Sequence, residues 1–117
     1  MTTQALGVYG ETLAAQHLVR RGMVLLDHNW HCKAGEVDLV LRDGRDLVFC
    51  EVKTRRSVGR GTPQEAVTEQ KAARMRRVAA AWIEAHDLHA PAVRLDVVAV
   101  LAPRRGDVQI EHVVGIG

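Results

Sequence analysis

Charged residues interrupt two strongly apolar segments of the sequence, 36–41 and 47–53. Asp38 is in the first segment, and Glu51 and Lys53 close the second with one residue between them. Because alternate side chains of a strand point to the same face, Glu51 and Lys53 share a face if this segment is a strand. Charged side chains are costly to bury in such apolar strands unless they are paired or bind a metal.

Two carboxylates and a lysine on neighbouring strands could catalyse the hydrolysis of a phosphodiester. Asp38 and Glu51 offer the hard oxygen ligands that Mg²⁺ and Mn²⁺ prefer. A bound metal would neutralise the phosphate and lower the pKa of an attacking water, and Lys53 would orient that water or stabilise the developing charge. The same residues could instead form a cross-strand salt bridge on a solvated sheet face, which is common and contributes little to stability. The pattern alone leaves both interpretations open.

Glu11 is a candidate third acid. It lies three residues from both Val8 and Ala14 and seven from Leu18, so in a helix its carboxylate points toward the apolar side. The helix could therefore bring a third carboxylate close to the sheet. Alternatively, Glu11 lies at the rim, where it extends into solvent or pairs with a basic residue of the later helix, which starts at residue 69.

Basic residues are concentrated in one part of the chain. Residues 53–77 contain eight lysines and arginines and two glutamates, a net charge of +6, whereas the whole chain has a net charge of +2. Concentrated positive charge suits the phosphate backbone of DNA, although a merely solvated helix face is the alternative. The candidate phosphate-contacting residues are Arg55, Arg56, Arg60, Lys71, Arg74 and Arg77.

Hydrophobic periodicity and capping signals predict an α/β fold with a mixed sheet. The expected elements are a helix over 4–21, an apolar run at 24–26 that continues to 34 as strand or irregular chain, strands 36–41 and 47–53 around a turn at 42–45, a helix from 69 to about 86, and strands 93–101 and 108–114. Thr68 is the favoured N-cap of the long helix. A capping-box pattern from Thr62 to Glu65 is a second candidate start.

The composition limits the class of protein. A length of 117 residues suits one hydrophobic core, so we predict a single domain over residues 1–117. No apolar stretch is long enough to cross a membrane, and the first six residues lack the features of a secretory signal. Cys32 and Cys50 stand apart and are expected to be reduced. These observations predict a soluble, cytoplasmic protein with no membrane partner.

Short motifs are spread over nearly the whole chain. They are Gly10-Glu11, Asn29-Trp30, Gly35-Glu36-Val37-Asp38-Leu39-Val40, Phe49-Cys50-Glu51-Val52-Lys53-Thr54-Arg55, Ala66-Val67-Thr68 with Lys71, and Arg94-Leu95-Asp96-Val97-Val98. Together they resemble the small bacterial YraN-type family of predicted endonucleases. The central motifs are similar to the PD-(D/E)xK nuclease core and, in size and order of elements, to archaeal Holliday-junction resolvases. Val37 stands where the name of that core has a proline.

The resemblance implies a restriction-endonuclease-like fold, in which helices flank a central mixed sheet and the hairpin carries the metal site. It implies that Asp38 and Glu51 bind Mg²⁺ or Mn²⁺, that Lys53 is the catalytic lysine, and that Glu11 completes the site. The implied activity is hydrolysis of structured or branched DNA, and a homodimer is left open. The alternative is a catalytically silent module that keeps the fold and binds nucleic acid or protein, against which the intact acids and lysine argue.

Glu36 lies two residues before Asp38, so the two side chains share a strand face. We expect Glu36 to support the site, by pairing with Lys71 or a nearby arginine or by tuning the metal, rather than to be a direct ligand. Three histidines could act as a general base, but no regular spacing connects them: His28, His31 and His112.

Overall fold

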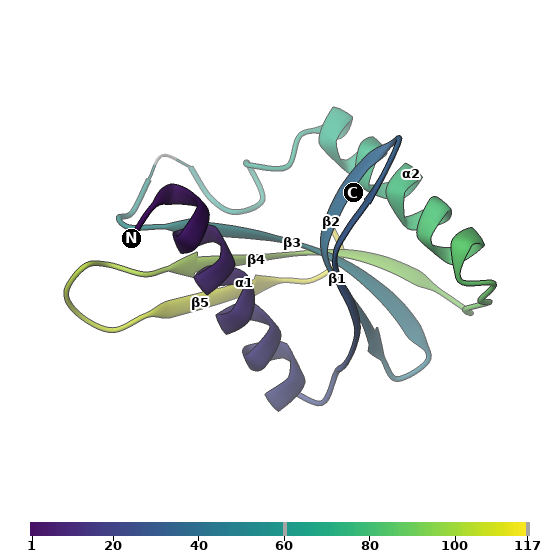
Figure 1. Cartoon of the computed structure of the whole chain (residues 1–117), viewed down its shortest axis with the longest axis horizontal. Helices are drawn as coiled ribbons and strands as arrows, with labels where there is room; N and C mark the ends of the chain where they lie inside the picture. The colour runs from purple at the N-terminus through teal and green to yellow at the C-terminus, as the bar shows by residue number, and fades with distance from the viewer. Residues whose placement is uncertain (60, 117) are drawn as a thin grey trace.

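The structure is a computed structural model that describes residues 1–59 and 61–116. This part of the chain forms two helices and five strands. The elements are α1 (Thr3–Arg20), β1 (Val24–Cys32), β2 (Gly35–Asp43), β3 (Asp46–Arg55), α2 (Glu69–Ala85), β4 (Val93–Leu101) and β5 (Gln109–Val113). The strands make one sheet in the order β1-β2-β3-β4-β5, in which β3 and β4 are parallel and the other neighbours are antiparallel. The predicted α/β class with a mixed sheet is confirmed (Figure 1).

The long helix α2 begins where Thr68 predicts. Thr68 has the extended backbone of an N-cap, and its Oγ1 accepts a hydrogen bond from the Lys71 N–H at 3.1 Å. The second candidate start is wrong: the Thr62 hydroxyl accepts a hydrogen bond from the Glu65 N–H at 3.2 Å, but the chain there forms only turns before it extends again at Thr68. Neither helix in the described part of the chain is long and apolar enough to span a membrane.

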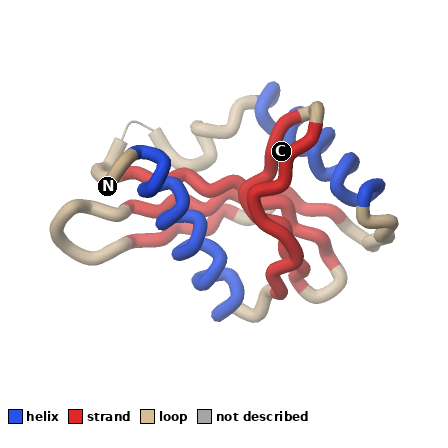
Figure 2. The backbone as a smooth tube through the Cα atoms, viewed as in Figure 1, coloured by secondary structure: helices blue, strands red, loops and turns tan. Residues whose placement is uncertain are grey.

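The two helices cover opposite faces of the sheet (Figure 2). The hydrophobic cluster under α1 includes Val48 and Cys50, whereas the cluster under α2 includes Phe49. These residues alternate along β3, so the clusters lie on its two sides. By the same alternation Glu51 and Lys53 lie on the α2 face.

Strand β2 separates from β3 beside Asp38. Backbone pairing of the two strands extends from their turn only as far as Leu39 and Cys50. One residue further, Asp38 Oδ2 accepts a hydrogen bond from the Val52 N–H at 2.8 Å. A side chain thus satisfies a backbone donor that a paired strand would otherwise satisfy. The hairpin of β1 and β2 turns away from the rest of the sheet near this point (Figure 1).

Candidate functional site

A cleft of about 280 Å³ opens where β2 separates from β3. Residues of β2 and β3 line it on one side, and residues at the N-terminal end of α2 line it on the other. The lining residues that the sequence had singled out are Glu36, Asp38, Glu51, Lys53, Lys71 and Arg74. The structure therefore brings the two strand acids and the lysine of the sequence hypothesis into one cleft.

The Asp38 carboxylate is mostly buried beside other acids. Burial raises its pKa from the ordinary value of 3.8 to about 6, against the opposing effect of the Val52 N–H. Negative charges on three neighbouring acids add to the increase: Glu11, Glu51 and Glu36. A cation would relieve this repulsion, so the surroundings of Asp38 favour a bound positive charge.

The two carboxylate oxygens of Glu51 have different surroundings. Oε1 lies 2.6 Å from Lys71 Nζ and 3.8 Å from Lys53 Nζ. Oε2 is buried and has no hydrogen-bond partner in the part of the chain that the structure describes. Leaving a buried carboxylate oxygen without a partner is costly. Glu51 therefore has one oxygen that is neutralised by lysine and one that is free to bind a ligand.

Lys53 and Lys71 differ in basicity although they are neighbours. Contact with Lys71, followed by burial, lowers the pKa of Lys53. Burial alone would also lower the pKa of Lys71, but its contacts with Glu51 and Lys53 outweigh that effect and raise it. Lys71 is thus held as an ammonium group against Glu51, whereas the longer contact of Lys53 leaves it more available to a further partner.

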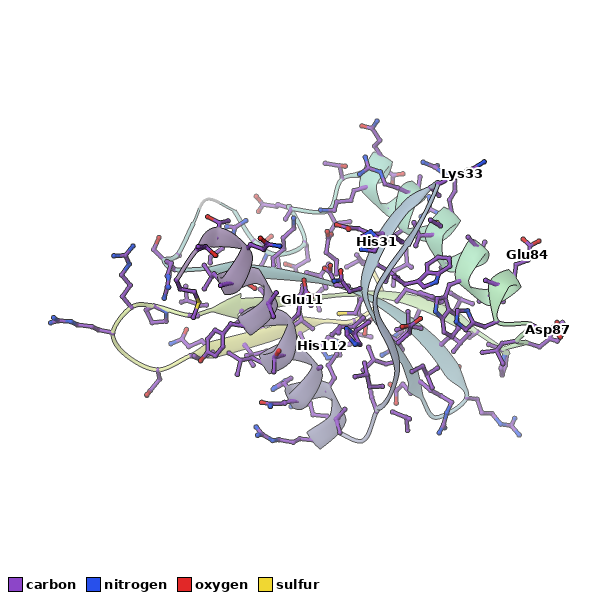
Figure 3. All side chains as sticks on the ribbon, viewed as in Figure 1. Glu11, His31, Lys33, Glu84, Asp87 and His112 are labelled. Carbon is purple, nitrogen blue, oxygen red and sulfur yellow. The ribbon has the colours of Figure 1, made fainter. Side chains whose placement is uncertain are left out.

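Glu11 acts on the cleft from the other face of the sheet. Helix α1 approaches β3 closely at Gly10, where a Cβ would overlap a β3 side chain, and the next residue is Glu11 (Figure 3). Burial and then the charge of Glu36 raise the pKa of Glu11, and His28 partly opposes them. The charge of Glu11 in turn raises the pKa of Asp38. The charged groups that shift the pKa of Glu11 thus come from the β1–β2 hairpin, and no residue of α2 is among them.

The acids offer a divalent cation two separate carboxylates rather than a closed cage. Within residues 1–59 and 61–116, no three His, Cys, Asp or Glu side chains converge closely enough to hold a metal ion. The partnerless Glu51 Oε2 and the like charges around Asp38 nevertheless fit a hard cation. Mg²⁺ usually keeps several waters and takes only one or two carboxylates. Asp38 and Glu51 are therefore the residues that fit such an ion.

Glu36 has a different partner from the one expected. Its Oε2 lies 3.2 Å from Nδ1 of His31 (Figure 3), which is opposite Glu36 in the register of β1 and β2. Lys71, the expected partner, contacts Glu51 instead. The predicted pairing of Glu36 with Lys71 is wrong because strand register places His31 next to Glu36, while α2 directs Lys71 toward β3.

The predicted phosphate-contacting residues differ in their surroundings. Arg74 and Arg77 are exposed on α2, and Arg74 also lines the cleft. Arg56 is half-buried and donates through Nη1 to a backbone carbonyl at 3.4 Å. Arg55 is exposed at the end of β3. Arg60 lies outside the described residues.

A second cluster of charged groups surrounds Asp96 on β4. Asp96 is completely buried. Its carboxylate accepts two hydrogen bonds from Arg94 at 3.0 Å each and one from the Gly115 N–H at 3.1 Å, and His112 Nε2 lies 2.7 Å from it. His112 is therefore engaged away from the cleft. The sequence signals for this cluster are the motif Arg94-Leu95-Asp96-Val97-Val98 and the arginine two residues before Asp96, on the same face of the strand.

These observations define an α/β protein whose mixed sheet opens onto a cleft of opposed acids and lysines. A family model described as "Uncharacterised protein family UPF0102" matches residues 10–100, and the chain belongs to this family. A UPF0102 protein of Nocardioides sp. is 59% identical over 114 residues, which cover 97% of this chain and 92% of that protein. UPF0102 proteins of Kineococcus radiotolerans and Beutenbergia cavernae are 55% and 53% identical over 113 residues, covering 96% and 97% of this chain and 93% and 96% of theirs.

Proposed function

We propose that the protein is a divalent-metal-dependent endonuclease that hydrolyses phosphodiester bonds of structured or branched DNA. The observation that carries the proposal is Glu51 Oε2, a buried oxygen without a partner in the described chain, in a cleft that Asp38 and Lys53 also line. A purely structural salt bridge would use both oxygens or expose the spare one to water. The mixed sheet with a helix on each face supports a restriction-endonuclease-like assignment of the fold.

Each residue of the cleft has a part in this chemistry. Asp38 and Glu51 would hold Mg²⁺ or Mn²⁺, which when bound supplies positive charge at the phosphate and a more acidic water. Lys53 donates hydrogen bonds to a phosphate oxygen and stabilises the charge that develops there. Glu11, the third acid expected at the site, adds negative charge near Asp38 that favours a bound cation.

The basic surface beside the cleft supports a nucleic-acid substrate. Arg74 and Arg77 are exposed on the same helix that carries Lys71 at its first turn, and Arg74 also lines the cleft. A phosphate backbone that contacts this face of α2 would pass the cleft. Arginine contacts to phosphates recognise charge and not base identity. We therefore expect the shape of the DNA, rather than its base sequence, to select the substrate.

A cleavage panel tests the proposal. Duplex, single-stranded and four-way-junction DNA are incubated with the protein and Mg²⁺ or Mn²⁺, with and without EDTA. We expect EDTA-sensitive cleavage of the junction that is lost in Asp38→Ala and kept in Glu84→Ala, a matched acid at the far end of α2 (Figure 3). DNA binding without cleavage under every metal condition would refute the proposal and favour the silent module.

Lys53→Met separates chemistry from binding. Cleavage should fall by ~100-fold or more because a group that stabilises developing charge is lost, whereas DNA affinity should change little. Replacing Arg74 and Arg77 together by alanine should do the reverse and flatten the salt dependence of binding. Gel-shift titrations at several salt concentrations measure the DNA affinity of both variants, and the cleavage panel measures their activity. An equal loss of affinity in the two variants would make Lys53 a binding residue.

A further inference from the structure

The ion pair between Lys71 and Glu51 is the shortest contact in the cleft and has no part in the chemistry described above. Lys71 Nζ lies 2.6 Å from Glu51 Oε1, against 3.8 Å for Lys53 Nζ. Both side chains of the pair are largely buried, with exposed fractions of 25% and 19%. A contact this short and this sheltered fixes the orientation of the carboxylate.

Lys71 is itself held in place by the start of α2. Its backbone N–H donates to Thr68 Oγ1, so the residue belongs to the capped first turn. Residues of that turn have little conformational freedom. The ammonium group is therefore delivered to Glu51 from a rigid helix end, not from a mobile loop.

The pair leaves the two oxygens of Glu51 unequal. Both lysines approach Oε1, and Oε2 remains buried with no partner in the part of the chain that the structure describes. A carboxylate rotating freely would share its contacts between both oxygens. Lys71 thus selects which oxygen is neutralised and which one stays available.

We propose that Lys71 is a positioning residue, whose ammonium group holds Glu51 Oε1 so that Oε2 is presented as a ligand for a divalent cation. This inference rests on the proposed function and refines it. Removing a partner that orients a metal ligand typically lowers metal affinity by ~10- to 100-fold. Lys71 therefore belongs to the metal site and not, as its charge suggested, to the phosphate-contacting surface.

Mn²⁺ titration calorimetry on the full chain without DNA tests this role. We expect Lys71→Met to bind Mn²⁺ ~10-fold more weakly than the wild type, and Lys71→Arg to recover most of the loss. Arg20→Met removes the same charge from an exposed position at the end of α1, so it should leave the affinity unchanged. Thermal melting without metal shows whether each variant is folded. If Lys71→Met does not fold, Lys71→Gln, whose amide can donate to Oε1, replaces it with a smaller expected loss.

The outcomes separate this inference from the function on which it rests. Wild-type binding together with equal or tighter binding by folded Lys71→Met would overturn the positioning role, because Lys71 would then be a spectator or a competitor of the metal. The proposed nuclease would survive that result. A wild type that binds no Mn²⁺ would overturn both.

Discussion

Two acids in similar strands of this protein have opposite surroundings. Asp38 lies in Glu-Val-Asp-Leu-Val on β2, and Asp96 lies in Arg-Leu-Asp-Val-Val on β4. Asp96 is completely buried, yet arginine, histidine and a backbone N–H all contact its carboxylate. Asp38 accepts a hydrogen bond from the Val52 N–H, and three neighbouring acids raise its pKa.

The difference separates a structural acid from a candidate functional one. Around Asp96, opposite charges and hydrogen bonds compensate the cost of burial and attach β5 and the chain after it to β4. Around Asp38 and Glu51, burial and like charges remain partly uncompensated. Unrelieved electrostatic repulsion at a cleft is typical of sites that bind a ligand or catalyse a reaction. Substitutions of the two acids should therefore change stability in opposite directions.

Asp96→Ala is expected to have the largest effect on stability. Removing the carboxylate leaves Arg94 and His112 without their buried partner, which typically costs about 3–5 kcal/mol. Urea unfolding at pH 7.5 measures the change. Asp43→Ala removes the more exposed partner of Arg94 and should cost no more than about 1 kcal/mol. A cost for Asp96→Ala as small as that of Asp43→Ala would remove the distinction between the two acids.

Asp38→Asn should instead stabilise the protein at neutral pH while removing metal binding. Because the pKa of Asp38 is raised from 3.8 to about 6 on folding, the folded state loses stability as pH rises between these values, and asparagine avoids that loss. The gain should reach up to about 3 kcal/mol above pH 6 and vanish below about pH 4.

Urea unfolding of the wild type and Asp38→Asn at pH 4 and pH 7.5 measures this gain. The comparison at pH 4, where the two proteins should be nearly equally stable, is the control. Destabilisation by Asp38→Asn at pH 7.5 would indicate a compensated acid of the Asp96 kind. It would also remove the electrostatic argument for a cation at this position.

Of these substitutions, Glu11→Gln should change the stability of the protein least. It tests whether the charge of Glu11 contributes to the raised pKa of Asp38. Loss of one like charge should lower the pKa of Asp38 by less than about one unit, with little change in melting temperature. Carbon-detected NMR titration of the Asp38 carboxyl measures the shift, and Glu84→Gln at the distant end of α2 is the control. An Asp38 pKa that is identical in the wild type and Glu11→Gln would place Glu11 outside the site.

Local patterns predicted much of the fold. The Thr68 cap and the strand 93–101 agree with the structure, because caps and strand alternation depend on neighbouring residues. The turn expected at 42–45 is shorter and lies at 44–45, since Arg42 and Asp43 still pair with β3. The expected strand or irregular chain after residue 26 is strand to Cys32. The capping-box pattern at Thr62 failed because a cap alone does not maintain a helix without an apolar face to bury.

The candidate site was predictable only in part. The spacing of Glu51 and Lys53 was enough to place them on one face, and strand pairing brought Asp38 to the same cleft. The partners of these charges were not predictable. Lys71 was expected to pair with Glu36, but it contacts Glu51, because the packing of α2 against the sheet decides which acid it reaches. The expected contact of Lys71 with DNA stays a prediction.

The sequence by itself determined the elements, the two faces of β3 and the set of acids and lysines available for chemistry. Tertiary structure decided that both oxygens of Asp96 are paired, whereas Asp38 stays among like charges and only one oxygen of Glu51 is paired with lysine. The physical reason is range: strand and helix periodicity act over a few residues and could place only Arg94 beside Asp96, whereas the other groups that compensate these buried charges come from distant parts of the chain. Asp96 of β4 contacts His112 of β5 and the Gly115 N–H just after β5, and Glu51 of β3 contacts Lys71 of α2.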